Sequence, residues 1–272
     1  MKNLGNLLIF LVLIVFMSSC TKESSDDSYS TNNEYIKSVS TGGKIVHKYL
    51  YDHASNVVEE NCLFYFKKYI YGENERLAKV ESAFDRSGFS STFTVPRTEF
   101  MTSQNSTVDS YSLYEYDKDG RLSAIEHYFN ETGEGFEYRS KQTIEYKGSF
   151  IVKVNLHNPE GQITQFHEFT YDKNGNVSND KHYSNLFGSK EELLSEISYK
   201  YDKYENPYRI FSMLGSPGLW TNTNNIIETS VTRHSEVPGF DKYSTSKTTY
   251  KYNNNGYPIK EITENSEFEY NY

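Results

Sequence analysis

Histidines are the residues of this chain whose type and spacing come closest to a site for chemistry. His127 and His182 each lie seven residues after a glycine, Gly120 or Gly175, and each precedes a tyrosine. Two imidazoles on neighbouring hairpins could bind zinc, but no third ligand recurs with them. We therefore predict that the two histidines occupy equivalent packing positions, and we predict no metal site.

The other motifs that are similar to metal-binding or catalytic motifs are better explained as structural features. Asp117 to Gly120 is similar to a calcium loop, but its glycine and acidic residues stand at the wrong positions, so it predicts a turn. His167-Glu168 lacks the second histidine of a zinc-peptidase helix. Cys62 has no basic neighbour that would lower the pKa of its thiol, and we predict that it is buried. No nucleophile elbow or phosphate loop occurs, so we predict no catalytic residue and no cofactor.

Aromatic residues in irregular segments are the candidate ligand contacts. Residues 214–240 hold the only tryptophan, Trp220, among glycines and prolines, and a second irregular segment spans 85–109. Long irregular segments in a compact domain are commonly functional. Trp220, with Tyr208 and Tyr243, could stack on a sugar ring or an aliphatic partner. The alternative is that Trp220 fills the mouth of a barrel.

Seven copies of a short phrase define the elements that must position these residues. In each copy two large residues flank a third, so both point to one face of a strand. Asp or Asn often follows, and in three copies a glycine stands three residues later, where a positive φ costs little. Each copy therefore predicts the end of a strand and a hairpin turn. The copies lie at 49–52, 69–71, 114–117, 144–146, 169–172, 199–202 and 250–253.

Hairpins that follow one another without helices predict an all-β fold. Seven hairpins give an antiparallel meander of about fourteen strands. Because long free edges promote aggregation, we expect the sheet to be closed, or nearly closed, into a wide barrel-like shape. Leu122 and Ile125 break the strict alternation and predict a β-bulge. Ser189 to Glu192 fits either the start of a short helix or a loop that enters a strand.

Composition supports a sheet and narrows the partners. The chain has 25 Tyr and 17 Phe, and aromatic residues are typical of strands. Lys and Arg number 28 against 37 Asp and Glu, which gives a formal net charge of −9. An acidic chain without a basic stripe argues against nucleic acid as a partner.

The N-terminus is predicted to be a processed export signal. The apolar run from Leu7 to Met17 is too short for a membrane span and is typical of a secretory signal. The Ser-Ser-Cys sequence that ends at Cys20 resembles the bacterial lipobox. This resemblance implies that residues 1–20 are a lipoprotein signal peptide and that Cys20 carries the lipid that anchors the protein to the membrane.

Behind Cys20 the chain divides into two parts. Residues 21–33 are almost entirely polar and predict a flexible tether. Residues 34–272 are expected to form a single antiparallel β domain. The acidic residues of the tether resemble the signal that sends Bacteroidetes lipoproteins to the cell surface, which implies display on the outer membrane.

The repeats themselves support a resemblance. Tyr-x-Tyr-Asp-x-x-Gly phrases resemble the YD repeats of bacterial Rhs-type shells. The phrases that begin at Tyr201, Asn224 and Tyr250 are similar to those of Bacteroidetes lipoproteins of unknown function with a porin-like β fold. The resemblance implies a fold and an envelope location and no activity. The strands lack the apolar rows that face lipid, so we do not expect a membrane-spanning barrel.

These observations predict a lipid-anchored envelope protein that binds without catalysis, with a glycan or a protein as its ligand at the outer-membrane surface. Two alternatives stay open. The first is a structural or assembly lipoprotein that faces the periplasm. The second is a hydrolase with paired carboxylates inside the sheet.

Overall fold

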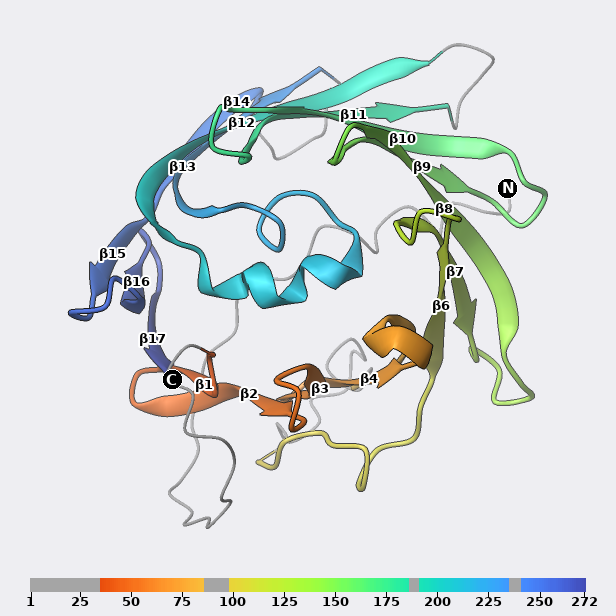
Figure 1. The fold of residues 1–272 in the computed structure, drawn as a ribbon, viewed down its shortest axis with the longest axis horizontal. Coiled ribbons are helices and arrows are strands. Elements are labelled where there is room, and N and C mark those ends of the chain that lie inside the picture. The colour runs from red at the N-terminus through yellow and green to blue at the C-terminus, as the bar shows by residue number, and fades with distance from the viewer. Residues whose placement is uncertain (1–34, 86–97, 186–190, 235–240) are drawn as a thin grey trace.

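The computed structural model describes residues 35–85, 98–185, 191–234 and 241–272. These residues form one antiparallel sheet of 17 strands that curls into a nearly closed barrel (Figure 1). Strand β1 pairs with β17, so the first and last strands of the chain are neighbours. The predicted all-β meander is confirmed.

The strands follow one another around the barrel in chain order. The sheet has three strands more than the expected fourteen. Strands β1 and β17 lie outside the seven hairpins. The third is β14, which pairs with β13, whereas β15, which begins just after Thr248, pairs with β16. The bounds are β1 Ser38–Thr41, β2 Lys44–Tyr51, β3 Val57–Cys62, β4 Tyr65–Tyr71, β5 Leu77–Phe84, β6 Ser110–Tyr116, β7 Leu122–Phe129, β8 Glu137–Lys147, β9 Phe150–His157, β10 Ile163–Tyr171, β11 Val177–Ser184, β12 Glu192–Glu205, β13 Asn224–Arg233, β14 Tyr243–Lys247, β15 Thr249–Tyr252, β16 Pro258–Ile262 and β17 Glu267–Asn271, with short 3-10 helices η1 Glu73–Glu75 and η3 Pro207–Leu214.

The repeated phrases form the predicted turns. Asp117 Oδ1 accepts hydrogen bonds from the backbone N–H groups of Asp119 and Arg121, both at 2.9 Å. Gly120 has a φ of +77°, which glycine adopts at little cost. The same turn recurs at Asp172. The carboxylate of Asp117 is thus held by turn amides, and the prediction of a turn is confirmed.

The predicted bulge lies in the same place in several hairpins. The register of β6 and β7 shifts between Glu115 and Tyr116, which leaves Ser123 as the extra residue. Equivalent shifts occur beside Tyr51, Tyr71, Tyr146, Tyr171 and Tyr252. A bulge bends the strand and increases its twist, which helps the sheet to curl.

The last tyrosine of the phrase ties each hairpin to the one before it. Tyr116 OH donates to the carbonyl oxygen of Leu77 at 2.8 Å. Five further copies make the equivalent bond, namely Tyr51 to Ile36, Tyr71 to Val57, Tyr146 to Leu122, Tyr171 to Ile151 and Tyr201 to Val177. Tyr272, which lies outside the copies, donates in the same way to the carbonyl oxygen of Pro258. Tyr252 departs from the pattern and donates to the carboxylate of Asp202. These bonds run around one rim and hold neighbouring hairpins together.

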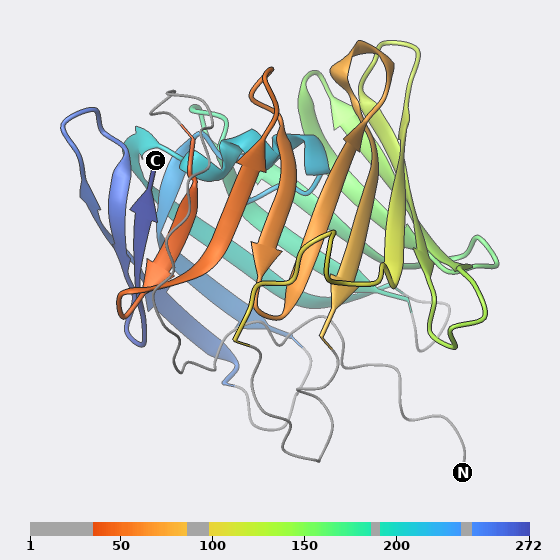
Figure 2. The same ribbon diagram turned by 90° about the horizontal axis from the view of Figure 1, so that it is seen from below.

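An insertion replaces the turn between β12 and β13. We call residues 206–223 the plug, because they lie across the interior near one rim (Figures 1 and 2). Helix η3 begins after Asn206, whose Oδ1 accepts from the N–H of Tyr208 at 3.0 Å, and it ends at Gly215. We call the rim with the plug and the repeated turns the plug rim, and the opposite rim the far rim.

The plug contacts opposite walls of the barrel. The ring of Phe211 is 1% exposed and packs on Tyr49 of β2, with 5.4 Å between ring centroids. Gly215 approaches β7 so closely that a Cβ atom there would lie 2.3 Å from Leu122 Cδ2. On another side, Asn222 accepts a hydrogen bond from a β11 amide. The main hydrophobic core therefore lies at the plug rim, between the plug and the wall.

Two further segments settle earlier expectations. Residues 98–109, the described part of the first irregular segment, pack on β3 to β5, where Met101 is 3% exposed against Phe66. Strand β12 begins at Glu192, which favours a loop entering a strand over a helix. Ser189 lies outside the described residues.

Candidate binding surface

Two of the three predicted aromatic contacts come together in the plug. The ring of Trp220 lies edge-on to Tyr208, with centroids 5.5 Å apart, and to Phe211 at 5.2 Å. Trp220 and Tyr208 are half-buried against the main core. These contacts pack the Trp220 ring against the plug and agree with the alternative in which Trp220 fills the mouth of the barrel.

The third predicted contact lies elsewhere. Tyr243 is 66% exposed at the start of β14 and pairs with Thr232, near the far end of β13. The plug joins β13 at Asn224, eight residues away, which is roughly 26 Å at 3.3 Å per residue. Tyr243 and Trp220 therefore do not share one small site. Cys20, the predicted lipidation site, lies outside the described residues.

Strand register defines which side chains point into the barrel. Tyr69 points inward, because its ring contacts Phe211 of the plug. Directly paired residues of antiparallel strands lie on the same face. Inward orientation therefore passes from Tyr69 to Val80, then to Ser112 and His127. The same rule carries the assignment on to β14.

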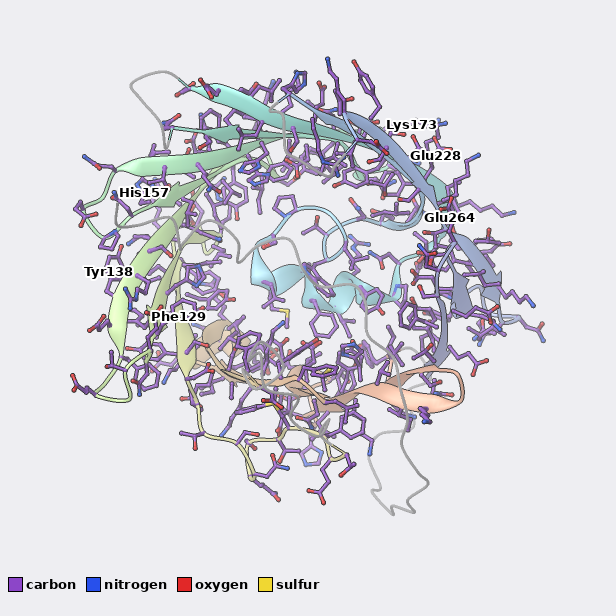
Figure 3. All side chains as sticks on the ribbon, turned by 180° about the vertical axis from the view of Figure 1, so that it is seen from behind. Phe129, Tyr138, His157, Lys173, Glu228 and Glu264 are labelled. Carbon is purple, nitrogen blue, oxygen red and sulfur yellow. The ribbon has the colours of Figure 1, made fainter. Side chains whose placement is uncertain are left out.

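We call the inward-facing residues of β5 to β14 the inner wall. Uncharged polar side chains occupy much of it. They are Ser82, Ser110, Ser112, His127, Ser140, Gln142, Gln165, His167, His182, Ser195, Thr229, Ser244 and Ser246. Most are half-buried, and Ser244 and Ser246 are exposed, so solvent reaches this face. Figure 3 shows the side chains along the ring, with Phe129 and His157 on the β7 to β9 side.

The outer face is charged by contrast. Lysine and glutamate side chains pair across and along strands there, as Lys79 with Glu81, Lys141 with Glu115 and Glu126, Lys153 with Glu168, Lys181 with Glu196, Lys200 with Glu228, and Lys260 with Glu267. A surface that faces lipid needs rows of apolar residues. Among the described strands, the outer face has ion pairs in their place.

One carboxylate is buried on the inner side of β3. Glu60 is 5% exposed and accepts hydrogen bonds from Tyr65 OH at 2.6 Å and Tyr69 OH at 3.1 Å. Lys67 Nζ lies 3.5 Å away and His47 Nδ1 3.7 Å away. Burial raises the pKa of Glu60, but the Lys67 ammonium and the tyrosine donors outweigh it and hold the pKa below its usual value. The carboxylate is fully satisfied, which is typical of a structural ion pair.

A histidine pair lies on the inner wall at β10 and β11. The rings of His167 and His182 stack with centroids 4.4 Å apart and planes 6° apart. Asp180 Oδ1 lies 2.8 Å from His167 Nδ1, and Gln165 Oε1 lies 3.3 Å from His182 Nε2. Burial and the neighbouring His167 lower the pKa of His182 to about 4.

The repeat-equivalent His127 has a different partner. Its Nδ1 lies 2.8 Å from Ser112 Oγ, and burial lowers the pKa of its ring. His127 and His182 thus occupy equivalent inward positions, as predicted. Within the described ranges, no three His, Cys, Asp or Glu side chains are grouped so that they could hold a metal ion. Cys62 is 5% exposed, as predicted, and burial raises the pKa of its thiol.

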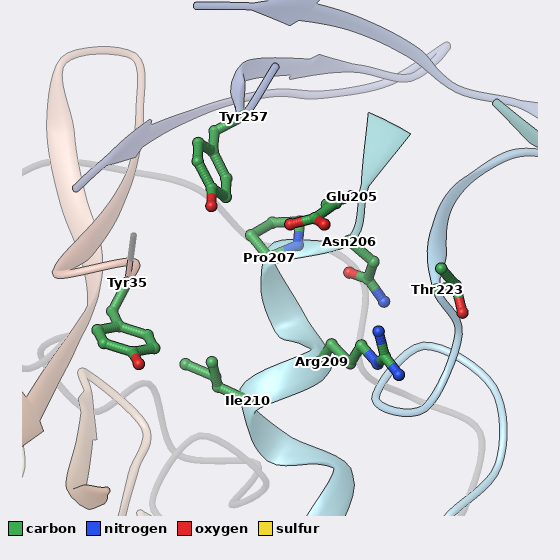
Figure 4. A pocket seen from close by; sticks show the side chains of 8 residues that line it. All are labelled: Tyr35, Glu205, Asn206, Pro207, Arg209, Ile210, Thr223 and Tyr257. Carbon is green, nitrogen blue, oxygen red and sulfur yellow. The ribbon is translucent and has the colours of Figure 1, made fainter. Parts of the chain in front are cut away.

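A small hollow of about 170 Å³ lies at the plug rim beside η3 (Figure 4). Tyr35 and Ile210 line one side, and Arg209 and Thr223 line another. Ligand pockets usually exceed about 300 Å³, so this hollow fits only a small group. It does not compete with the inner wall as a surface for a larger ligand.

The inner wall and η3 were not among the sequence predictions, although the sequence contains a signal for each. The residues Asn206-Pro207 and Gly215 are a helix cap, a favoured first residue and a favoured last residue. Division of each strand into alternate faces separates serines and histidines from lysines and glutamates. Both patterns consist of common residue types, so they are less conspicuous in the sequence than the single Trp220.

One solved structure among those compared supports the fold. A porin-like protein from Bacteroides vulgatus ATCC 8482 superposes with a TM-score of 0.52 and 12% identity, over 88% of this chain and 98% of that one. A porin-like protein from Bacteroides uniformis ATCC 8492 gives 0.39 and 11%, over 86% and 96%. TcdB2-TccC3-TEV gives 0.30 and 12%, over 80% of this chain and 10% of that one.

Sequence comparisons add no family. No protein-family model matches the chain, and no curated protein matches it significantly. Of the helices in the described part of the chain, none is long and apolar enough to cross a membrane. The structural superposition alone shows that the chain shares the porin-like β fold of the Bacteroides vulgatus protein.

Proposed function

We propose that this protein is a lipid-anchored, non-catalytic module of the outer-membrane surface that binds a neutral glycan on its inner wall. The observation that carries the proposal is the contrast between the two faces of the sheet. The inner wall holds many hydroxyls, amides and imidazoles beside a few charged side chains such as Asp180 and Arg233, whereas the outer face holds rows of ion pairs.

The chemistry of the inner wall suits sugar hydroxyls. Each hydroxyl or primary amide can both donate and accept hydrogen bonds, as can a neutral imidazole. His127 and His182 stay neutral at pH 7, because burial lowers their pKa values. A wall with few charges offers little to an anionic polymer and does not repel a neutral one.

Aromatic rings stand where the inner wall reaches the far rim. Tyr65 and Phe84 are paired in register with ring centroids 6.0 Å apart, and Phe84 is 44% exposed. Phe129 lies inward on β7, opposite Ser110. Aromatic side chains contribute large contact areas to binding surfaces, so the rings of Tyr65, Phe84 and Phe129 provide stacking faces at the far rim.

Titration calorimetry tests the ligand class. The protein with Cys20→Ala, which lacks the lipid, is titrated with cellohexaose, maltohexaose, mannohexaose and xylohexaose, and separately with polygalacturonate. We expect at least one neutral hexasaccharide to bind and the polyanion not to bind. Binding of the polyanion alone, or of no sugar, would contradict the proposal.

Protease treatment of intact cells tests the location. If the domain is accessible, protease removes it from cells that carry the anchored protein. The Cys20→Ala protein, which has no lipid anchor, is the control and is expected to be absent from the cell surface even without protease. Protection of the anchored protein would favour the alternative that faces the periplasm.

A protein partner at the far rim is a second candidate. Six large apolar residues are more than a third exposed at the ends of strands there, namely Ile45, Phe64, Phe84, Phe136, Ile163 and Tyr243. Exposed apolar groups of this kind mark interaction surfaces when they are contiguous. Crosslinking in cells through a photoreactive residue at Tyr243 would identify such a partner, and recovery of the monomer alone would count against it.

A further inference from the structure

The histidine pair of the inner wall has an arrangement that assigns its protons. His167 on β10 pairs with His182 on β11, which pairs with Ser195 on β12. Gln165 lies two residues before His167 on β10, and Asp180 lies two residues before His182 on β11, so both are on the same face as the histidines. Five polar side chains thus meet on one patch of wall.

Asp180 sets the tautomer of His167. A carboxylate can only accept hydrogen bonds, so His167 Nδ1, which is 2.8 Å from Asp180 Oδ1, must carry the hydrogen. Whenever the ring carries a single hydrogen, Nε2 is then a lone-pair acceptor. The side chain of His167 is 37% exposed, whereas that of its orienting partner Asp180 is 14% exposed.

His182 carries its hydrogen on Nε2, the opposite tautomer to that of His167. Its ring stays neutral at pH 7, because its pKa is about 4. Gln165 Oε1 accepts from Nε2–H at 3.3 Å, which leaves the amide N–H groups of Gln165 as donors. The two rings stack face to face, so their in-plane lone pairs do not converge on one ion.

We propose that His167 Nε2 accepts a hydrogen bond from a hydroxyl group of a sugar ring, while the Gln165 amide and the Ser195 hydroxyl hold the adjacent hydroxyl. This subsite rests on the proposed function and names the residues that carry it. The acceptor and one donor lie on β10 and the second donor lies on β12, across β11. Together they match a pair of adjacent hydroxyls, each of which donates and accepts. Asp180 acts through His167 and is a positioning residue.

Matched substitutions test the acceptor. In His167→Asn the amide N–H replaces Nδ1–H toward Asp180, but nothing replaces Nε2. In His167→Gln the amide oxygen can reach the position of Nε2. We expect His167→Asn to weaken binding of the best neutral hexasaccharide about three- to tenfold, and His167→Gln to recover part of it. His157→Asn is the control, because His157 lies on the outer face and bonds Thr143.

The outcomes separate this inference from the proposed function. If no hexasaccharide binds the unaltered protein, both are wrong. If a hexasaccharide binds and His167→Asn binds it equally well, the subsite is wrong and the proposed function stands. Nitrogen-15 NMR of the imidazoles, without ligand, gives an independent reading. We expect the Nδ1–H tautomer for His167, and the Nε2–H tautomer would overturn the inference.

Discussion

At the scale of single residues, the tyrosine hydroxyls of the plug rim are the bonds whose contribution is most easily measured. Tyr116→Phe removes the donor to the carbonyl of Leu77, a residue that is 1% exposed. A buried carbonyl without its partner costs about 1–2 kcal/mol. We expect urea unfolding to show that loss, while Tyr243→Phe on an exposed ring changes stability by less than about 0.5 kcal/mol. Equal effects would show that the rim bonds are not stabilising.

His182 also predicts a dependence of stability on pH. The folded pKa is about 4 and the ordinary value is 6.5, so the unfolded chain takes up the proton first. The contribution of His182 is complete above pH 6.5 and is lost as the pH falls toward 4. We expect the free energy of unfolding to decrease from pH 7.5 to pH 5, and His182→Gln to have a shallower slope. An unchanged slope in the variant would contradict the assignment.

At the scale of elements, the plug makes a testable contact with β7. Gly215→Ala places a Cβ atom 2.3 Å from Leu122 Cδ2 at a φ of +69°. Gly175 has a φ of +84°, but its nearest neighbour would be 3.6 Å away. We expect Gly175→Ala to cost about 1–2 kcal/mol from backbone strain alone. Gly215→Ala should cost about 1–3 kcal/mol more from overpacking.

Thermal and urea unfolding of the two glycine variants measure that difference. The fluorescence of Trp220, the only tryptophan, reports on the plug in the same experiment. If the two variants lose equal stability, the plug is not packed against β7.

The elements show which sequence signals are local. Turns at Asp117 and Asp172 could be predicted, because a carboxylate or glycine acts within four residues of its own position. The bulge beside Leu122 could be predicted from alternation alone. The place of Trp220 could not, because it depends on contacts with Phe211 and with strands far away in the sequence.

At the scale of the whole molecule, the polar groups of the proposed binding surface are spread over many common residues. The repeats predict the barrel, but aromatic residues in irregular segments do not mark one site, because Trp220 and Tyr243 lie far apart. Ser112 and Ser195 become neighbours of histidines only when strands pair in this register. Their place on the inner wall depends on strand pairing, which the sequence alone does not contain.

The most direct test of the account compares two positions on one strand. Ser195 points inward on β12 and Ser198 points outward. Tyrosine is favoured in strands, so Ser195→Tyr and Ser198→Tyr should both fold. Calorimetry with the best neutral hexasaccharide then measures the affinity of each variant. If the inner wall binds the glycan, Ser195→Tyr weakens binding at least about tenfold, which is about 1.4 kcal/mol, and Ser198→Tyr leaves it unchanged. Equal affinities, or loss only in Ser198→Tyr, would contradict the account.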